Sequence, residues 1–229
     1  MALATPVAAG PPYFSDDPVP TDYRHFEIYA LAAGSHTHNS DSGAAGIDFN
    51  YGATPDLQLT AVFPVEFEHG RDGPLAAGVG NVELGAKFRI LNQERFGWDV
   101  AVFPRAFLPS LSDRLGARHA SLLIPIWIGR DIGEWSTFGG GGCELNQGGD
   151  DQDFCLAGWV VTRAVSRRLR IGGEVFHQTA NTRGGEAATS LGAGGTYDLT
   201  PGRHLLGYVS RDISGAEQTS WYAAVLFTF

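Results

Sequence analysis

Apolar and polar residues alternate along most of this 229-residue chain. The clearest stretch covers residues 81–90, in which every second residue is apolar and the residues between them are polar, charged or Gly. Side chains of a β-strand point alternately to its two faces, so this pattern predicts a strand with one apolar and one polar face. No long window shows the period of about 3.6 residues that is typical of an amphipathic helix. The pattern therefore predicts an all-β protein.

Turn-forming residues divide the chain into about twelve segments of strand length. We expect strands at residues 23–34, 45–53, 56–68, 79–91, 98–109, 119–130, 134–145, 153–165, 168–179, 188–199, 203–212 and 219–229. Their lengths suit the roughly 9 to 11 residues with which a tilted strand crosses a bilayer. An even number of antiparallel strands brings both termini to one side, as in bacterial outer-membrane barrels.

The expected connections differ in length according to the strand that they follow. Long polar connections follow the odd strands, at residues 35–44, 69–80, 110–118, 146–152, 180–187 and 212–218, and short ones follow even strands, at 53–56, 131–133 and 200–203. Long loops on one side and short periplasmic turns on the other are typical of outer-membrane barrels. The sequence therefore predicts a closed antiparallel transmembrane up-and-down β-barrel at residues 22–229. An extended N-terminal segment rich in Pro and Asp precedes it at residues 1–21.

The chain ends in an alternating strand whose last residue is aromatic, Phe229. Bacterial outer-membrane barrels share this ending, although a strand of a soluble sandwich has the same pattern in isolation. We expect the last strand to pair with the segment near Phe26 and close the barrel. Pro64, Pro104 and Pro125 fall within predicted strands, and because Pro has no N–H to donate, we expect bulges there.

Composition narrows the classes of protein. No stretch approaches the roughly 20 apolar residues of a membrane-spanning helix, and the mean hydropathy of −0.08 fits a barrel whose two faces average out. The formal net charge of −9 argues against a nucleic-acid surface. The first residues lack the charged and apolar regions of an export signal. Either the chain is close to a mature form with an added Met, which we favour, or the interpretation that it is exported by such a signal fails. The expected partners are outer-membrane lipid and a small solute, and the expected location is a Gram-negative outer membrane. The sequence does not determine the oligomeric state.

Charged residues of both signs occupy the face opposite the apolar one. In a soluble sandwich they would be solvated, whereas in a barrel they would line the lumen, where they pair or border a path. The candidates are Glu27, Asp48, Glu66, Glu83, Lys87, Arg89, Asp99, Arg105, Arg163, Arg170, Glu174 and Asp198. About twelve strands lie between the filled eight-stranded barrels and the open porins of 16 to 18 strands, so both a narrow pore and an interior plugged by salt bridges fit.

Two other residue types could carry chemistry. Cys143 and Cys155 lie equidistant from Gly149, so a symmetric hairpin would place them opposite one another and allow a disulfide; two free thiols or a metal site are the alternatives. The seven His residues are scattered, form no HExxH motif and define no metal site. We therefore expect no cofactor, no catalytic residue and no enzyme.

Five short stretches carry a family resemblance. They read PPYFSDDP at residues 11–18, NYGATPDLQL at 50–59, VELGAKFR at 82–89, FPRAFLP at 103–109 and GEVFHQTA at 173–180. They resemble the outer-membrane transporters grouped as "MetA pathway of phenol degradation" proteins, over nearly the whole chain. The resemblance implies an outer-membrane barrel that passes small, hydrophobic or aromatic molecules, and it supplies no catalytic residue.

Three hypotheses follow from the sequence. The first is a passive channel or transporter for a small solute, whose selectivity is set by the charges of the lumen. The second is a non-conducting barrel that serves a structural or surface-interaction role through its loops. The third is a membrane-embedded hydrolase, which would need a Ser and a His within hydrogen-bond reach.

Overall fold

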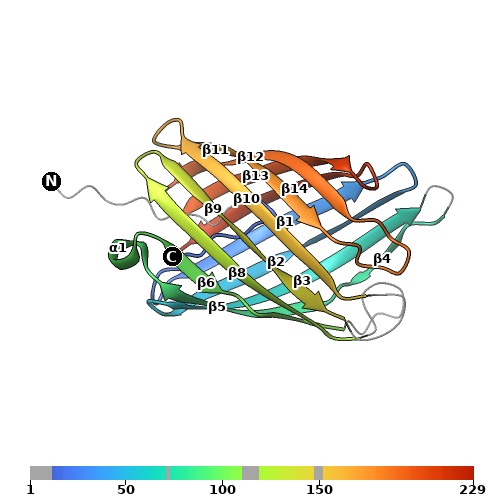
Figure 1. Ribbon diagram of the computed structural model, residues 1–229, viewed down its shortest axis with the longest axis horizontal. Helices are drawn as coiled ribbons and strands as arrows, with labels where there is room; N and C mark the ends of the chain where they lie inside the picture. Colours follow the sequence, from blue (N-terminus) through green and yellow to red (C-terminus); the bar gives the residue numbers. More distant parts are fainter. Residues whose placement is uncertain (1–11, 71–72, 110–118, 147–151) are drawn as a thin grey trace.

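The structure is a computed structural model that describes residues 12–70, 73–109, 119–146 and 152–229. In these residues, fourteen strands form one antiparallel sheet that curls into a closed barrel (Figure 1). The strands are β1 (Phe26–His36), β2 (Ser40–Thr54), β3 (Leu57–Gly70), β4 (Ala76–Val79), β5 (Val82–Leu91), β6 (Asp99–Val102), β7 (Arg105–Leu108), β8 (Ser121–Ile132), β9 (Trp135–Leu145), β10 (Phe154–Ala164), β11 (Leu169–Gln178), β12 (Ala188–Thr200), β13 (Arg203–Ser214) and β14 (Thr219–Thr228).

Two barrel positions are each occupied by two strands in line. Strands β4 and β5 both pair with β3, and β6 and β7 both lie between β5 and β8. Fourteen strands minus these two duplications leave twelve barrel positions, so the predicted fold class and strand number are confirmed.

The barrel closes between its first and last strands. β1 and β14 pair without a register shift from Glu27 opposite Thr228 to His36 opposite Thr219. The Phe26 amide donates to the Phe229 carbonyl at 2.7 Å, and the Phe229 amide donates to the Phe26 carbonyl at 3.1 Å. The predicted pairing of the last strand with the segment near Phe26 is therefore confirmed, and the sheet has no free edge at this seam.

The strand pairing is interrupted on the side of the barrel whose strands contain prolines. The interruption between β6 and β7 falls at Phe103 and Pro104, and the one between β4 and β5 falls at Gly80 and Asn81. The Gly80 amide donates to the Pro64 carbonyl at 3.0 Å, and the Phe103 amide donates to the Pro125 carbonyl at 3.0 Å. Each interruption therefore lies across from a proline in the neighbouring strand, although β8 continues through Pro125.

Two predicted loops contain strand residues. The predicted loop 69–80 holds β4 (Ala76–Val79), which pairs with β3. Residues 35–44 were expected to form a long connection, but β1 and β2 continue to His36 and Ser40 and leave residues 37–39 between them. The polar side chains pair across this hairpin, with Ser35 Oγ 2.9 Å from Ser42 Oγ and His36 Nδ1 2.6 Å from Asp41 Oδ1. Their polarity reflects strand ends rather than a loop. The predicted loop 110–118 and most of the loop 146–152 lie outside the described residues.

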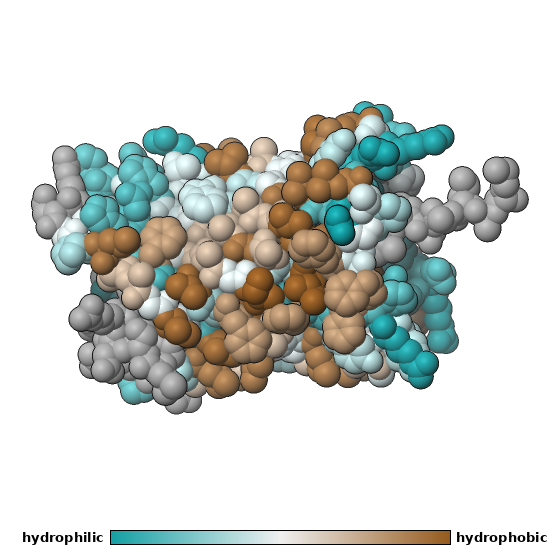
Figure 2. All heavy atoms as spheres, turned by 180° about the vertical axis from the view of Figure 1, so that it is seen from behind, coloured by the Kyte–Doolittle hydropathy of each residue, from teal (hydrophilic) through white to brown (hydrophobic). Residues whose placement is uncertain are grey.

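The outer surface of the barrel is apolar at mid-height and polar at both ends (Figure 2). Large exposed apolar side chains occur on neighbouring strands around the barrel: Phe49, Phe63, Phe88, Ile126, Trp159, Val175, Leu191, Val209 and Trp221. The inward positions of the same strands hold buried polar residues, among them Asn50, Lys87 and Glu174. This distribution is the reverse of that in a soluble protein.

The two ends of the barrel differ. The turn end carries Phe229, the short connections and the helix α1 (Gln93–Phe96), whereas the longer connections lie at the opposite loop end (Figure 1). None of the described helices is long and apolar enough to cross a membrane.

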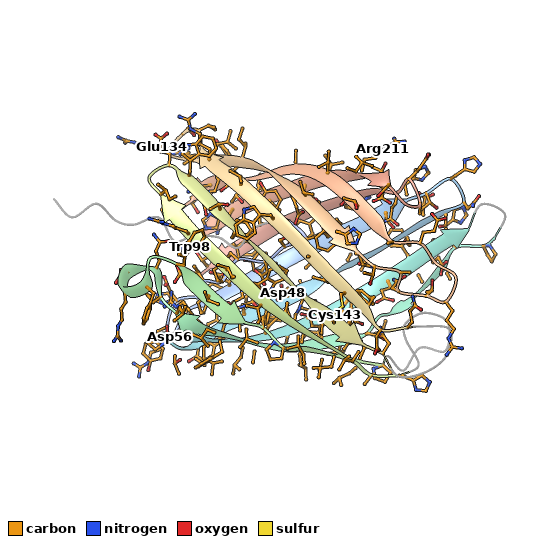
Figure 3. The ribbon with its side chains drawn as sticks, viewed as in Figure 1. Asp48, Asp56, Trp98, Glu134, Cys143 and Arg211 are labelled. Carbon is orange, nitrogen blue, oxygen red and sulfur yellow. A yellow bond between two sulfur atoms is a disulfide. The ribbon has the colours of Figure 1, made fainter. Side chains whose placement is uncertain are left out.

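A disulfide joins β9 and β10 toward the loop end (Figure 3). Cys143 lies directly opposite Cys155 in the register of the two strands, and both positions are exposed. The predicted bridge is therefore confirmed, because the antiparallel register of β9 and β10 sets the two residues opposite each other.

Candidate functional site

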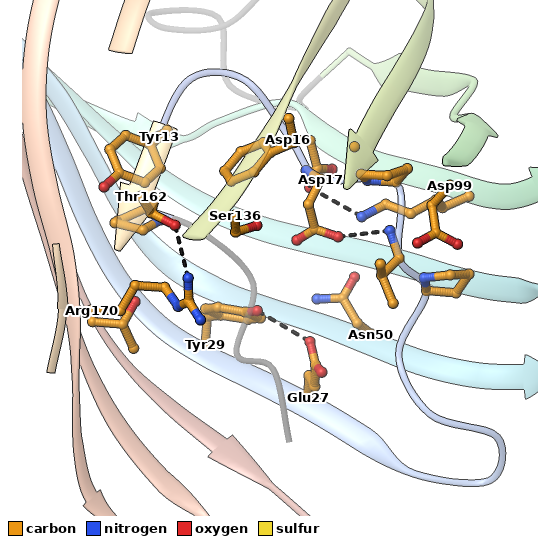
Figure 4. A pocket seen from close by; sticks show the side chains of 18 of the residues that line it. Tyr13, Asp16, Asp17, Glu27, Tyr29, Asn50, Asp99, Ser136, Thr162 and Arg170 are labelled. Atoms are coloured by element: carbon orange, nitrogen blue, oxygen red, sulfur yellow. Dashed lines mark hydrogen bonds and ion pairs between the residues drawn. The ribbon is translucent and has the colours of Figure 1, made fainter. Parts of the chain in front are cut away.

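The candidate site is the lumen of the barrel, which the N-terminal segment enters. Residues 12–22, called the strap below, precede the first strand and cross the interior from the β3 wall to the wall formed by β10 to β12 (Figure 4). They form no strand pairing of their own; a single bridge follows them, between Tyr23 and Gly52 of β2. Contacts with several strands, rather than a ladder, therefore hold the strap in place.

A buried carboxylate anchors one end of the strap. Glu174 of β11, whose exposed fraction is 3%, accepts the backbone amide of Ser15 on Oε1 at 2.7 Å and that of Phe14 on Oε2 at 3.1 Å. Tyr13 donates its hydroxyl to the Gly194 carbonyl at 3.0 Å. Hydrogen bonds to an ionised acceptor are stronger than neutral ones, so Glu174 contributes more to this anchorage than a neutral acceptor would.

The other end of the strap is fixed to the opposite wall. Lys87 Nζ lies 3.0 Å from Asp16 Oδ1, and the Lys87 side chain is nearly fully buried. The Thr21 amide and hydroxyl both donate to Gln58 Oε1, at 2.8 and 3.1 Å. Gln58 in turn donates to Asn50 Oδ1 at 2.7 Å. The strap is thereby tied to β2, β3 and β5 through side chains that point inward.

Inward-facing glycines leave the space in which the strap lies. A Cβ at Gly129 would stand 2.8 Å from Pro18 Cδ, one at Gly172 would stand 2.7 Å from the Tyr13 hydroxyl, and one at Gly158 would overlap Ser15 Oγ. Distances below about 3.0 Å require a neighbour to move. The glycines of β8, β10 and β11 are therefore complementary in shape to the strap.

Aromatic rings fill the space around the anchored end. The Tyr13 ring centroid lies 6.1 Å from that of Phe138 and 5.4 Å from that of Tyr208, in edge-on arrangements. The Phe14 ring lies 5.0 Å from that of Phe176. Such pairs contribute roughly 0.5–1.5 kcal/mol beyond the area that they bury. They add apolar contacts to the hydrogen bonds at Glu174.

A cavity of about 760 Å³ remains beside the strap. Strap residues such as Asp16 and Asp17 form one side of it, and Glu27, Tyr29 and Asn50 of the barrel wall form another (Figure 4). The cavity extends to the turn end, where residues of the short connections border it. The lumen is therefore narrowed by the strap and is not completely filled.

Eight of the twelve residues expected in the lumen border this cavity: Glu27, Asp48, Glu83, Lys87, Asp99, Arg105, Arg170 and Asp198. Glu174 lies at the strap instead. Arg89 is placed near the turn end, with Nε 3.0 Å from Asp56 Oδ1 and Nη1 3.6 Å from Asp99 Oδ1. Glu66 lies on an inward position of β3 beside Gly80 and does not border the cavity.

Arg163 was expected in the lumen but lies on the outer face. It follows the buried Thr162 in β10, half of its side chain is exposed, and Nη2 lies 3.1 Å from Glu134 Oε2. Its guanidinium also lies 5.3 Å from the centre of the Trp135 ring. Successive side chains of a strand alternate in direction, so the burial of Thr162 requires Arg163 to point outward. We therefore remove Arg163 from the lumen lining.

The hydrolase hypothesis needs a hydrogen bond between a histidine and a serine. The rings of His36, His177 and His204 bond to Asp41, Thr189 and Asp198 respectively, so none of these three bonds goes to a serine. The described residues also contain no group of three His, Cys, Asp or Glu side chains that could hold a metal ion.

Comparison with known proteins identifies the fold. No family model matches the chain, and no curated protein matches it. Among solved structures, the COG4313 outer membrane channel from Pseudomonas putida F1 is similar with a TM-score of 0.78 and 13% identity, over 97% of this chain and 100% of that one.

Two further barrels match less closely. The KdgM porin has a TM-score of 0.60 and 8% identity, over 89% of this chain and 99% of that one. The NanC porin has a TM-score of 0.59 and 9% identity, over 88% and 98%. At these identities the likeness shows a shared fold, that of outer-membrane β-barrels.

Proposed function

We propose that the protein is a passive channel of the bacterial outer membrane, and that small solutes cross through the lumen beside the strap. The observation that carries the proposal is the cavity of about 760 Å³ inside a closed barrel, bordered by charged residues and continuing to the turn end. A barrel with a purely structural role does not need such an internal cavity. The shared fold with outer-membrane channels and porins supports the same role.

The apolar belt supports the membrane location. Burial of apolar area is favourable by about 25 cal/mol per Å², so large exposed residues such as Phe63 and Val209 would be unfavourable in water. A closed barrel satisfies all of its backbone hydrogen bonds between strands, which is the condition for crossing a bilayer with strands. The resemblance to the phenol-degradation transporters supports the same location.

The lining of the cavity supports a small solute with an apolar or aromatic part. Leu31, Val62 and Phe103 border the cavity together with Tyr29 and Tyr222. The strap limits the size of the solute, because it occupies part of the cross-section. This solute class is also the one that the family resemblance implies.

Flux measurements test the proposal. Purified protein in liposomes should allow swelling by small solutes, and Glu83→Ala and Arg105→Ala should change the rate because the two side chains form an ion pair of 3.5 Å that borders the cavity. Arg163→Ala is the matched control, because it removes a charge from the outer face. A heat-dependent shift in gel migration shows that each variant is folded. Folded protein that gives no flux in any variant would refute the channel.

The strap also favours the second candidate, a non-conducting barrel. Anchors on opposite walls, Glu174 and Lys87, hold it across the lumen. If loosening the strap by Glu174→Gln produced no flux from folded protein, the non-conducting role would be supported.

A further inference from the structure

Some of the charged residues that border the cavity form ion pairs, and others do not. Glu27, Asp48 and Asp17 take part in none of the ion pairs found among the described residues. Each accepts a hydrogen bond from a neutral group instead. The Tyr29 hydroxyl donates to Glu27 Oε2 at 3.2 Å, Asn50 Nδ2 to Asp48 Oδ1 at 2.9 Å, and the Val19 amide to Asp17 Oδ1 at 2.7 Å.

Two of the five basic residues that border the cavity are neutralised by acidic partners. Lys87 is paired with Asp16 at 3.0 Å, and Arg105 with Glu83 at 3.5 Å. Arg130 and Arg167 border the cavity at exposed positions and take part in none of the ion pairs found among the described residues. Arg170 also has no acidic partner among these pairs, and its Nη1 donates to the Thr162 hydroxyl at 3.0 Å. It lies on β11, whereas Glu27 and Asp48 lie on the neighbouring strands β1 and β2. The wall formed by β1 and β2 is therefore the side of the cavity where negative charge is uncompensated.

Uncompensated charge in a narrow aqueous space has a stronger effect than on an open surface. Low-dielectric walls concentrate the field of the carboxylates in the lumen and raise the local concentration of ions of opposite sign. The strap strengthens the effect, because it narrows the lumen and contributes Asp17 to the lining. The same field makes the lumen unfavourable for anions.

We propose that the lumen selects cations over anions, and that the organic solutes it passes best carry a positive charge such as an ammonium group. Glu27 and Asp48 determine this preference from the barrel wall, and Asp17 adds to it from the strap. The inference rests on the proposed channel function and specifies its solute class.

Zero-current potentials across a planar bilayer test the inference. The full-length protein is measured at pH 8 in a KCl gradient near 0.1 M, where charges are screened over about 10 Å, and again near 1 M, where the screening length is about 3 Å. We expect K⁺ to be more permeant than Cl⁻ at the lower salt concentration and the preference to weaken at the higher one. Tetramethylammonium in place of K⁺ should also be preferred over Cl⁻.

Two variants test whether Glu27 and Asp48 determine the preference for cations. Glu27→Gln and Asp48→Asn each remove one charge and retain an oxygen acceptor, and each should lower the K⁺/Cl⁻ permeability ratio by about two-fold. Glu134→Gln is the matched control, because it removes one charge from the outer rim, where Glu134 is two-thirds exposed. Its ratio should equal that of the unmodified protein.

The outcomes separate this inference from the proposed function. A current that favours Cl⁻, or one without preference, would overturn the cation selectivity and leave the channel in place. An unchanged ratio in both Glu27→Gln and Asp48→Asn would overturn the assignment as well. No current from folded protein, either unmodified or carrying Glu174→Gln, would refute the channel and this inference with it.

Discussion

Single residues in this barrel take their roles from the side of the strand on which they lie. Thr162 and Arg163 are neighbours in sequence, yet one is buried in the lumen and the other pairs with Glu134 outside. Glu174 was expected among the lining charges, but its two oxygens hold the strap instead. Strand alternation can be predicted from a sequence. The partner that a buried carboxylate finds across the lumen depends on how the barrel closes.

Glu174→Gln should loosen the strap. A glutamine offers one acceptor oxygen where the carboxylate offers two, so one of the Phe14 and Ser15 amides loses its partner, and the remaining bond is no longer charge-assisted. We expect larger or more frequent conductance steps in a planar bilayer than for the unmodified protein. Glu134→Gln, on the outer rim, should leave the steps unchanged. Equal conductance in Glu174→Gln would show that this anchor does not control the opening.

The disulfide should stabilise the hairpin of β9 and β10. For a loop of this length, constraining the unfolded chain contributes about 3 kcal/mol. A double substitution, Cys143→Ser with Cys155→Ser, should therefore lower the denaturant concentration at which the barrel unfolds. Alkylation should shift the mass of the unmodified protein only after reduction. A mass shift without reduction would show that the bridge is not formed in the isolated protein.

At the scale of elements, one wall of the barrel is shaped to receive the strap. Gly129, Gly158 and Gly172 point inward from β8, β10 and β11, and a side chain at each of them would meet the strap. Their presence in strands was unexplained by sequence patterns, since glycine weakens a strand. The structure explains them, because the backbone of the wall must come close to the chain that crosses the lumen.

Gly129→Ala should displace the strap without breaking the barrel. Its Cβ would stand 2.8 Å from Pro18 Cδ and 3.0 Å from Phe138 Cβ, so a neighbour must move. A cysteine introduced by Ser15→Cys, at a position with no exposed area in the intact protein, should then react faster with a thiol reagent. Gly207→Ala is the control, because a Cβ there meets nothing within 4 Å. Equal reaction rates in the two backgrounds would contradict the role of Gly129.

The whole molecule carries apolar groups on its outside and polar groups on its inside. Its exposed aromatic and aliphatic side chains form a belt, whereas Lys87, Glu174 and Asn50 are buried. The hydrogen bonds between β1 and β14 close the sheet, so none of its backbone is left as a free edge at the seam. These features together suit a low-dielectric surrounding better than water.

A charge at mid-height of the outer surface should be unfavourable in proportion to its depth in the membrane. Val209→Arg, near the middle of β13, should lower the free energy of unfolding in lipid vesicles by about 2–4 kcal/mol, whereas Ile213→Arg, near the loop end of the same strand, should cost about 0–1 kcal/mol. Both side chains are exposed in the isolated barrel. If the two variants were equally stable, the proposed membrane location would be contradicted.

The sequence by itself determined the fold class, the approximate bounds of the strands and the disulfide. Alternation, turn residues and the symmetric placement of Cys143 and Cys155 are properties of short stretches of sequence. Such stretches are enough to predict which residues pair in a hairpin and to which face their side chains point. The sequence also placed most of the charged strand residues on the inner face. Pro104 already marked an irregularity in the sequence, whereas the break at Gly80 and the path of residues 12–22 were decided only by the tertiary structure. Both depend on contacts between segments far apart in the chain, such as Ser15 with Glu174, and such contacts leave no periodic signal in either segment.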